Sequence, residues 1–492
     1  MSAERPDALG AAARARALAA LADDTFDLLV VGAGATGCGT ALDAAARGLK
    51  VALVDAGDIA GGTSSRSSKL VHGGLRYLQT GDVVLVREAL AERELLLTRL
   101  APRLVRPLPF LVPLRHGWDR LYMGAGLTAY DGLARSGLLP GHARLSAAEA
   151  LEQFPDLRDD TLVGALRYYD AQMDDAHLAV ALARTAAGLG VAVATYTAVV
   201  SAEAERDADG LRRVTVRDAV GGGEITVAAR AVALCVGAWA PEVSGLFCDD
   251  GSASADGEAV GVVRSKGVHL RLPRAAISGT SAIIAPAGAS VLFVLPNPTH
   301  WLIGTTDTEW TLDLAHPAAS SADIDYLLDT VNQVLVTPLT RDDIDGVYAG
   351  LRPLISGDAD DATTKLSREH VVAEPVPGLV LVAGGKYTTY RVMAKDAVDL
   401  ALSGGDKDRA KDMPQSTTET VPLNGAVGWE WLSERFQILA RSSGLPEDAI
   451  DYLLSRFGTT ARDLLALVDA NPVLGERLPG GEDHLKVEIV YA

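Results

Sequence analysis

Three glycines and one aspartate have the residue types and the spacing that could bind a nucleotide cofactor. Gly32-x-Gly34-x-x-Gly37 directly follows the apolar run 26–31, and Asp55 ends the next apolar run. In such a turn the first glycine permits a tight bend, the second lets the backbone approach a pyrophosphate, and the third allows close packing of helix on strand. The aspartate can accept hydrogen bonds from a ribose. The pattern therefore predicts a dinucleotide-binding turn.

The elements that must position this turn are visible on both sides of it. A strand at 26–31, a helix at 38–47 ended by Gly48, and a second strand at 50–55 form a β-α-β unit. Such a unit implies a parallel sheet with a right-handed crossover. A lone glycine motif is a weak signal, because glycine turns that bind nothing are common. Here the two strands, the helix and the terminal acid agree, which favours cofactor binding.

Two later apolar runs, 229–237 and 379–385, also end in glycine. This is the pattern expected if one long cofactor is contacted repeatedly along the chain. A buried flavin fits that expectation better than an exchangeable nicotinamide, so the sequence favours FAD.

Composition excludes several classes of protein. The 492 residues suggest two or three domains, at about 150 residues per domain. The hydrophobic fraction of 48% and the charged fraction of 22% exclude extensive disorder. The formal net charge of −19 argues against nucleic-acid binding through the overall field.

Cysteine usage and hydropathy indicate where the protein works. The three cysteines show no disulfide or metal spacing, so we expect a reducing, cytoplasmic environment. No apolar stretch reaches the roughly 20 residues that a membrane-spanning helix needs. Residues 11–21 are alanine-rich with two arginines and loosely resemble a targeting segment, but the acids that follow favour an ordinary N-terminal helix.

The remainder of the chain alternates between both kinds of secondary structure. The sequence predicts helices at 82–100, 175–190 and 388–403, and a mainly helical region from 413 onward. Prolines make 102–114 a strand or a loop. Further strands are expected at 191–195, 259–272, 281–285, 290–295 and 300–304.

The hydroxyl-rich segment 63–78 closely resembles the flavin-contacting segment of the FAD-dependent glycerol-3-phosphate dehydrogenases. The resemblance covers about 26–490. Further matching blocks follow in the same order, at 89–94, 173–178, 265–269, 303–309, 350–354 and 384–391.

The resemblance implies an α/β fold with a discontinuous FAD-binding Rossmann-like domain, an antiparallel-sheet substrate domain of the D-amino-acid-oxidase type and a small helical C-terminal domain. Relatives usually have glutamate at the position of Asp55, and they continue past 486–491, so we expect a truncated C-terminal domain. The expected boundaries are an N-terminal extension at 1–25, an oxidoreductase region at 26–410 and the C-terminal domain at 411–492. Within that region the FAD domain is expected from about 26–80, 150–240 and 340–405, and the substrate domain from about 81–149 and 241–339.

The reaction that the resemblance implies is oxidation of sn-glycerol 3-phosphate to dihydroxyacetone phosphate, with a hydride passing from C2 to flavin N5. Such a site must hold a phosphate dianion, for which the planar fork of arginine is suited. It must also accept a proton, for which histidine is the usual group. Matching blocks place candidate catalytic and substrate-binding residues at Arg76, Tyr77, His269, Arg352, Arg368 and Lys386, with His269 as the base.

The same resemblance, together with the glycine motif, gives a set of candidate FAD contacts. Outside the family context, the serines could be a solvated loop and the arginines ordinary surface ion pairs. No metal site is expected. The candidate contacts are Gly32, Gly34, Thr36, Gly37, Asp55, Thr63, Ser64, Ser65, Ser67, Ser68, Lys69, Leu70, His72, Gly73, Val199, Gly237, Gly385, Lys386, Tyr387 and Thr388.

The expected electron acceptor is a membrane quinone, as in relatives that are peripheral membrane proteins, and a homodimer is possible. The segment 103–127 mixes Arg103, Arg106, Arg115 and Arg120 with aromatic residues, a composition that suits an anionic lipid surface or equally a core-packed connector. Three alternatives stay open: an oxygen-using glycerol-3-phosphate oxidase, an amino-acid or sarcosine-type oxidase of the same fold, and a flavin-binding protein with impaired catalysis.

Overall fold

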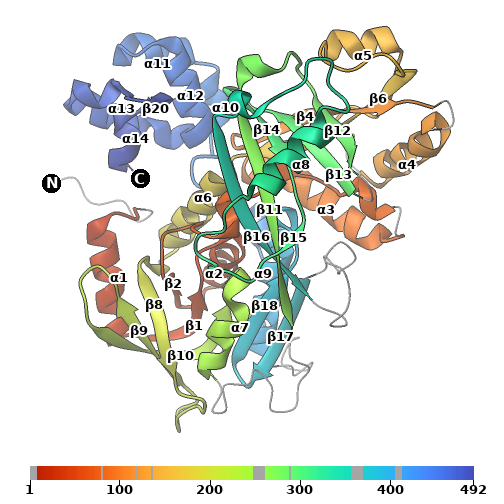
Figure 1. The fold of residues 1–492 in the computed structure, drawn as a ribbon. Helices are drawn as coiled ribbons and strands as arrows, with labels where there is room; N and C mark the ends of the chain where they lie inside the picture. Colours follow the sequence, from red (N-terminus) through yellow and green to blue (C-terminus); the bar gives the residue numbers. More distant parts are fainter. Residues whose placement is uncertain are drawn as a thin grey trace.

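Two large β-sheets and a helical C-terminal domain make up the fold (Figure 1). The computed structural model describes residues 8–78, 81–116, 119–134, 137–247, 261–287, 290–355, 370–404 and 413–491.

The first sheet contains the predicted β-α-β unit. Its strands run in the order β17-β18-β10-β1-β2-β7, with β8 and β9 attached beside β10. Every pairing from β18 to β7 is parallel, which places the carboxyl ends of these strands at one edge. The strands are β1 (Thr25–Val31), β2 (Val51–Val54), β7 (Ala192–Ala194), β8 (Thr197–Ala202), β9 (Arg212–Asp218), β10 (Glu224–Leu234), β17 (His370–Val376) and β18 (Leu379–Gly384).

Helices cover both faces of this sheet, because alternate strand residues point to opposite sides. Leu28 and Val30 join the core cluster formed with α2, α6 and α9, whereas Leu29 and Val31 join the cluster that includes α1 and α7. The apolar run of β1 is therefore buried on both faces of the sheet, as is usual for parallel strands. The helices named here are α1 (Ala11–Asp23), α2 (Ala35–Ala46), α6 (Asp175–Gly188), α7 (Ala240–Ser244) and α9 (Tyr390–Ser403).

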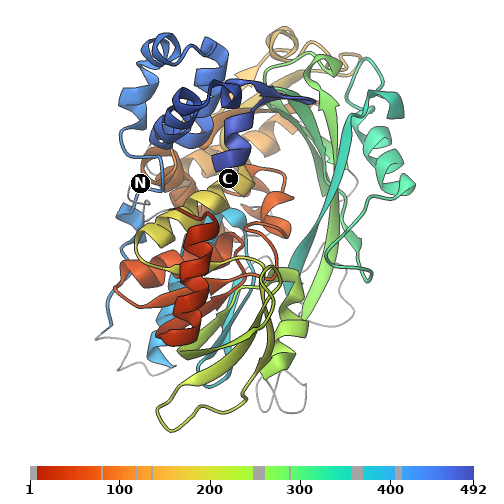
Figure 2. The ribbon, with the colours of Figure 1, turned by 90° about the vertical axis from the view of Figure 1, so that its left-hand side faces the viewer.

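The second sheet is largely antiparallel and runs along one side of the molecule in the turned view (Figure 2). Its order is β15-β11-β14-β13-β12-β4-β6-β3, with β16 paired to β11 and β5 to β6. The strands are β3 (Leu70–Val71), β4 (Val105–Leu114), β5 (Ala143–Leu145), β6 (Gly164–Met173), β11 (Val262–Pro273), β12 (Ala282–Ala287), β13 (Ser290–Pro296), β14 (His300–Gly304), β15 (Thr308–Glu309) and β16 (Gly346–Ile355).

Separate helices pack on the two faces of the second sheet. One core cluster contains residues of α5 and α8, and the other contains residues of α3 and α4. The helices are α3 (Val83–Leu95), α4 (Asp119–Leu133), α5 (Ala147–Gln153) and α8 (Ser321–Val331). The strand pairing divides the molecule differently from the sequence-based boundaries, because β6 and β16 lie in segments assigned to the FAD domain yet belong to this sheet.

The C-terminal domain has its own apolar core, which includes Leu453, Leu464 and Val487. It is helical as predicted, but it also contains a short hairpin that the sequence analysis missed, because strands of this length carry little alternating pattern. Its elements are α10 (Trp429–Ser433), α11 (Phe436–Ser443), α12 (Glu447–Phe457), α13 (Ala461–Ala470), β19 (Arg477–Leu478), β20 (Gly481–Leu485) and α14 (Lys486–Tyr491).

Candidate active site

A cavity of about 610 Å³ lies at the carboxyl edge of the parallel strands. Its volume falls within the roughly 300–1,000 Å³ that is typical of small-molecule sites. Residues that follow β1, β2, β10 and β18 all contribute to its wall, so this edge is where the switch in strand order creates a crevice. The cavity therefore lies where the glycine motif predicts a cofactor.

Close backbone contacts require glycine at Gly32 and Gly37, and Gly34 is tightly packed. Gly32 has a φ of +101°, and a Cβ there would lie 2.5 Å from the carbonyl oxygen of Cys235. A Cβ on Gly37 would lie 1.7 Å from the carbonyl oxygen of Gly32, so the start of α2 is pressed directly on the turn. A Cβ on Gly34 would lie 3.0 Å from Oγ of Ser64. Gly34, Ala35 and Thr36 at the start of α2 line the cavity, which is where a bound pyrophosphate would lie.

Asp55 lies directly after β2 and lines the same cavity. Its carboxylate accepts hydrogen bonds from the backbone N–H groups of Ala33 (2.6 Å) and Gly57 (2.8 Å). Burial raises the pKa of this carboxyl, while the two N–H groups act in the opposite direction. The carboxylate thus holds the phosphate turn to the end of β2 and keeps acceptor lone pairs for a ribose.

The structure brings most of the candidate cofactor residues to the cavity wall. Sequence reasoning missed others, notably Trp239, Pro353 and Met393, because apolar wall residues have no chemical signature. The candidates that line the cavity are Gly32, Gly34, Thr36, Asp55, Thr63, Ser64, Ser67, Val199, Gly237, Gly385, Lys386 and Tyr387.

The remaining candidate contacts sit behind this wall. The backbone N–H of His72 donates to Thr388 Oγ1 (3.2 Å), which ties this segment to the start of α9. The others that do not line the cavity are Gly37, Ser65, Ser68, Lys69, Leu70 and Gly73.

Asp175 holds the hydroxyl-rich loop (63–69) in place through hydrogen bonds and an ion pair. Its buried carboxylate accepts from the N–H and the hydroxyl of Ser67 (3.1 and 2.7 Å) and forms an ion pair with Lys69. Its carbonyl accepts from the hydroxyl of Tyr387 (2.5 Å), and Tyr348 donates to the carbonyl of Ser67 (2.7 Å). Neither Asp175 nor Tyr348 was assigned a role from the sequence, since a single acid after a strand is a common feature.

His269 lies on β11 behind this loop, 2% exposed. Its Nε2 is 2.9 Å from Oγ of Ser68, and its ring stacks on Tyr348 with centroids 4.8 Å apart. A Cβ on Gly304 would lie 2.2 Å from the imidazole, so this glycine makes room for the ring. Burial, together with the charges of Arg352 and Lys69, lowers the pKa of His269 to about 3. The imidazole is therefore neutral at ordinary pH.

Arg352 lies on β16 opposite Ser265 of β11. Its guanidinium donates to the carbonyl of Thr306 (3.2 Å) and to Thr305 Oγ1 (3.2 Å). A Cβ on Gly267 would lie 2.6 Å from Nη2, so the glycine gives the guanidinium its place. The side chain is 27% exposed, and its Nη1 lies 4.0 Å from a carboxylate oxygen of Asp307.

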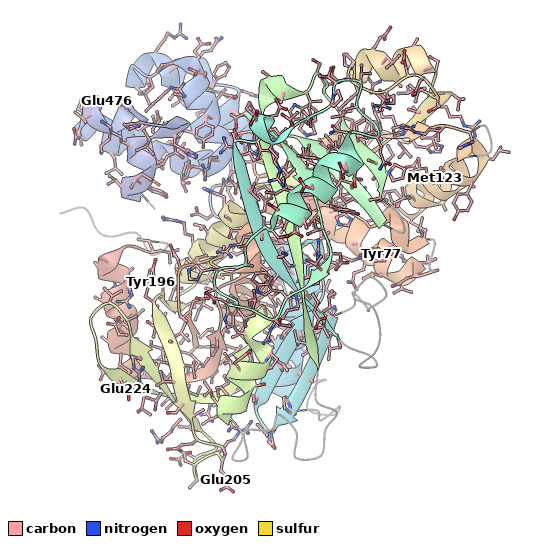
Figure 3. All side chains as sticks on the ribbon, viewed as in Figure 1. Tyr77, Met123, Tyr196, Glu205, Glu224 and Glu476 are labelled. Carbon is pink, nitrogen blue, oxygen red and sulfur yellow. The ribbon has the colours of Figure 1, made fainter. Side chains whose placement is uncertain are left out.

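Lys386 and Tyr77 come together from distant parts of the chain. The ammonium Nζ lies 3.7 Å from the ring centroid of Tyr77, on the 3₁₀ helix η2 (Leu75–Leu78). Figure 3 shows Tyr77 on the side of the molecule formed by α3 and α4. The backbone of Arg76 belongs to η2 and its side chain lies outside the described atoms, as does the whole of Arg368.

The arginines expected at a lipid surface lie in different environments. Arg103 is buried and donates to the carbonyl of Asn424 (2.7 Å), so its predicted place on a membrane-facing surface is wrong. Arg106 donates to Gln172 Oε1 (3.0 Å), and Arg115 donates to the carbonyl of Gln333 (2.9 Å). The side chain of Arg120 lies outside the described atoms.

Within the described ranges, no group of His, Cys, Asp and Glu side chains could hold a metal ion. No helix in this part of the chain is long and apolar enough to cross a membrane. Cys38 and Cys235 are both buried, and burial raises the pKa of both thiols, to about 12 for Cys235.

Comparison with known families gives two matches that together span most of the chain. Residues 27–400 match the family model described as FAD dependent oxidoreductase. Residues 416–492 match the model described as the C-terminal domain of alpha-glycerophosphate oxidase.

Similar proteins share both the sequence and the fold. Glycerol-3-phosphate dehydrogenase 2 of Mycobacterium tuberculosis is 49% identical, over 99% of this chain and 81% of that protein. The mitochondrial glycerol-3-phosphate dehydrogenase of Rattus norvegicus is 37% identical, over 95% of this chain and 65% of that protein. The solved glycerol-3-phosphate dehydrogenase of Bacillus halodurans, complexed with FAD, superimposes with a TM-score of 0.73 at 27% identity, covering 92% of this chain and 80% of that one.

Proposed function

The chain belongs to the FAD-dependent glycerol-3-phosphate dehydrogenase family, and from this membership we propose that it oxidises sn-glycerol 3-phosphate at C2 to dihydroxyacetone phosphate. One observation carries the proposal beyond membership. Lys386 lines the cavity, and Arg352 and His269, on the paired strands β16 and β11, lie just behind its wall: Arg352 precedes the lining residue Pro353, and His269 is hydrogen-bonded to Ser68, which follows the lining residue Ser67.

The cavity residues fit FAD. The glycine turn and the start of α2 would hold the pyrophosphate, Asp55 would hold the ribose, and the wall near Lys386 and Tyr387 would border the flavin ring. Bound FAD supplies the acceptor for the hydride that leaves C2 of the substrate.

Arg352 is the group best suited to the substrate phosphate. Its hydrogen bonds to Ser265, Thr305 and Thr306 fix the plane and the orientation of the guanidinium. A fixed planar fork binds phosphate bidentately, which a flexible ammonium cannot do. Lys386 adds a second positive charge next to Tyr77.

His269 is the proposed acceptor of the C2 hydroxyl proton. Its imidazole is neutral, as a base must be, and Nε2 already lies within hydrogen-bond distance of Ser68 Oγ. Ser68, next to the cavity-lining Ser67, would relay a proton between the cavity and Nε2. Burial is the main cause of the low pKa of His269, and the charges of Arg352 and Lys69 lower it further. A bound phosphate dianion would partly neutralise these two charges, which makes the imidazole a stronger base in the complex.

The proposed electron acceptor is a membrane quinone, reached by peripheral contact. Exposed apolar side chains on α3 and α4 support this contact: Val84 is 79% exposed, Leu121 62% and Tyr122 58%. Changing Val84 and Leu121 to glutamate should reduce co-sedimentation with anionic vesicles and slow quinone reduction. The same change at Leu312, which is 68% exposed outside these helices, is the matched control.

A visible spectrum of the holoenzyme before and after anaerobic sn-glycerol 3-phosphate tests the proposed reaction. Bleaching of the flavin band would support it, and a band that persists would exclude this substrate.

Oxygen is the second candidate acceptor, favoured by the match of 416–492 to an oxidase domain. Rapid re-oxidation in air with stoichiometric peroxide would favour oxygen over quinone.

A further inference from the structure

A buried polar cluster forms hydrogen bonds with the backbone of Gly73, just before the segment that carries Arg76 and Tyr77. The cluster consists of Arg93 on α3, Tyr130 on α4 and Asp170 on β6, which are 5%, 1% and 2% exposed. It does not line the cofactor cavity and takes no part in the chemistry proposed above.

The contacts of this cluster converge on one backbone group. The hydroxyl of Tyr130 donates to the carboxylate of Asp170 (2.8 Å to Oδ1), and Arg93 forms an ion pair with the same carboxylate. The N–H of Gly73 donates to the Tyr130 hydroxyl oxygen at 2.9 Å and lies 3.3 Å from Asp170 Oδ1. Because the Tyr130 proton goes to Asp170, the phenolic oxygen is free to accept from Gly73.

Burial makes this arrangement persistent. It raises the pKa of Tyr130 well above its ordinary value, so the hydroxyl keeps its proton. A buried backbone N–H without an acceptor is costly, so Gly73 is held to this oxygen. A Cβ on Gly73 would lie 2.5 Å from Tyr130 Oη and also 2.5 Å from Leu90 Cδ2, which shows how closely the backbone is pressed on the cluster.

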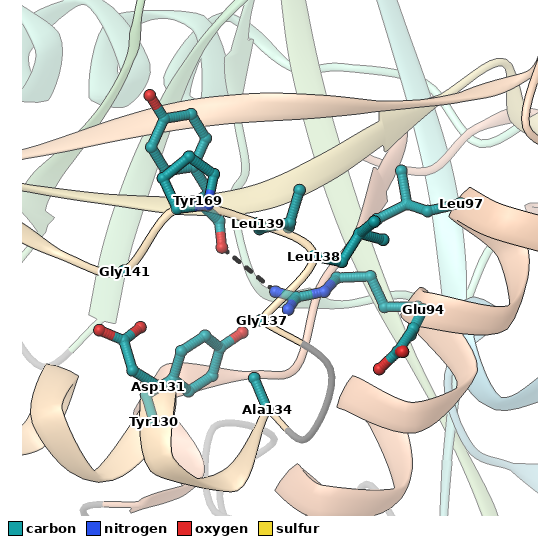
Figure 4. Close-up of a pocket in the computed structure, with 12 residues that line it drawn as sticks. Glu94, Leu97, Tyr130, Asp131, Ala134, Gly137, Leu138, Leu139, Gly141 and Tyr169 are labelled. Carbon is teal, nitrogen blue, oxygen red and sulfur yellow. Dashed lines mark hydrogen bonds between the residues drawn. The ribbon is translucent and has the colours of Figure 1, made fainter.

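Packing alone does not fix Tyr130 and Arg93. A second cavity of about 130 Å³ is lined in part by both side chains (Figure 4). Arg93 crosses this region to donate to the carbonyl of Tyr169 (3.1 Å), the dashed contact in the figure. Hydrogen bonds therefore determine where the Tyr130 hydroxyl lies.

The position of the Gly73 backbone also determines where the Tyr77 ring lies. Gly74 has a φ of +77°, and a Cβ there would lie 2.3 Å from the Tyr77 ring, so the chain turns back and the ring covers the glycine. The same ring carries Lys386 Nζ at 3.7 Å. The placement of two candidate substrate groups thus depends on the buried hydrogen bonds that the Gly73 N–H makes with Tyr130 and Asp170.

We propose that Tyr130 and Asp170 are positioning residues that fix the turn at Gly73 and Gly74 and thereby the ring of Tyr77 and the ammonium of Lys386. The inference rests on the proposed function for its kinetic readout. Neither residue contacts the substrate, so their effect is on how well the phosphate is bound.

Tyr130→Phe is the decisive variant, since it removes only the oxygen. Loss of one hydrogen bond should raise KM for glycerol 3-phosphate about three- to tenfold, with kcat changed less and with full FAD content. Tyr168→Phe is the matched control: Tyr168 is 3% exposed, packs edge-on against Tyr130 at 5.9 Å and, among the described residues, contacts neither Gly73 nor Asp170 by a hydrogen bond. Asp170→Asn should raise KM further and also lower Tm, because Arg93 loses its partner.

A readout without turnover separates this inference from the proposed function. Inorganic phosphate should perturb the flavin spectrum of the holoenzyme, and its Kd should rise by the same factor in Tyr130→Phe but not in Tyr168→Phe. If the wild type is not reduced by glycerol 3-phosphate, the proposed function fails while the phosphate titration still decides the positioning role. Equal KM and Kd in Tyr130→Phe and its control, or a rise matched by loss of FAD and Tm, would overturn the inference.

Discussion

At the scale of single residues, the most informative side chain is Arg352, because Ser265 and Gly267 of β11 and the threonines that follow β14 fix its guanidinium. Arg352→Ala should raise KM for glycerol 3-phosphate at least tenfold, since a lost charge-assisted contact with phosphate costs roughly 1.5–3 kcal/mol. Steady-state kinetics with saturating acceptor measure this directly. Arg341→Ala is the matched control, because Arg341 is an exposed arginine paired with Asp325 on the surface. Equal KM values in the two variants would remove Arg352 from the site.

His269 carries a prediction about pH. Its pKa is near 3 in the folded protein and near 6.5 when unfolded, so folding favours the neutral ring. This contribution to stability is complete above pH 6.5 and is lost as the pH falls toward 3. Between pH 8 and pH 5 the loss should be about 2 kcal/mol.

Urea denaturation of the holoenzyme at both pH values measures that loss. His269→Gln should lose less stability on acidification than the wild type, whereas His316→Gln, at an exposed histidine, should behave like the wild type. The same His269→Gln variant should lower kcat about 10²- to 10⁴-fold if the imidazole is the base. Wild-type kcat in this variant would assign the proton to another group.

At the scale of elements, the contact between α2 and β1 decides whether the cofactor binds. Gly37→Ala should give protein with little or no FAD, because its Cβ would overlap the carbonyl oxygen of Gly32 and push α2 away from the phosphate turn. The ratio of flavin to protein absorbance measures this. Gly126→Ala, in α4 with nothing within 4 Å of the new Cβ, should retain full FAD. Stoichiometric flavin in Gly37→Ala would contradict the assignment of this turn to the pyrophosphate.

The elements around the cofactor were predictable from sequence for a physical reason. Parallel strands buried on both faces give continuous apolar runs, and a phosphate turn admits few residues besides glycine, so 26–31, Gly32 and Gly37 carry strong local signals. The second sheet depends on contacts between residues that are far apart in the sequence. Gly304 makes room for His269, and Gly267 makes room for Arg352, only because β11 pairs with β14 and β16.

Buried polar partners were the hardest feature to predict. Asp170 and Tyr130 occupy an ordinary strand and an ordinary helix, and nothing in their spacing shows that they meet at Gly73. Arg103 gave a misleading signal, because an arginine among aromatic residues suits a lipid surface as well as a buried contact. Side chains of this kind acquire their roles from long-range packing, which a local pattern does not encode.

At the scale of the whole molecule, the C-terminal domain contacts α6 close to Asp175, which holds the hydroxyl-rich loop. Arg456 of α12 lies 3.6 Å from Asp174, the N-cap of α6, and the next residue is Asp175, which holds Ser67 and Lys69. Arg184 of α6 also contacts the Tyr491 ring, at 4.4 Å from the guanidinium carbon to the centroid. Docking of the domain therefore stabilises α6, and through Asp175 of α6 it stabilises the hydroxyl-rich loop.

Arg103 is the central contact of this docking. Its guanidinium is buried beside Gly425 and Gly458, where a Cβ would lie 2.8 and 2.3 Å from the arginine side chain, and it donates to Asn424. Burial lowers its pKa to about 9. Arg103→Ala should destabilise the protein by about 2–4 kcal/mol, because it leaves a cavity and an unpaired carbonyl between the two parts.

The expected consequence reaches beyond stability. Limited proteolysis should release the region 416–491 earlier in Arg103→Ala than in the wild type, and FAD should dissociate faster because α6 loses support. Arg115→Ala is the matched control, since Arg115 directly follows β4, which Arg103 precedes, and it contacts Gln333 near the surface. If Arg103→Ala lowers Tm while the rate of FAD dissociation stays at the control value, the domain is a separate stabilising unit and does not support the hydroxyl-rich loop.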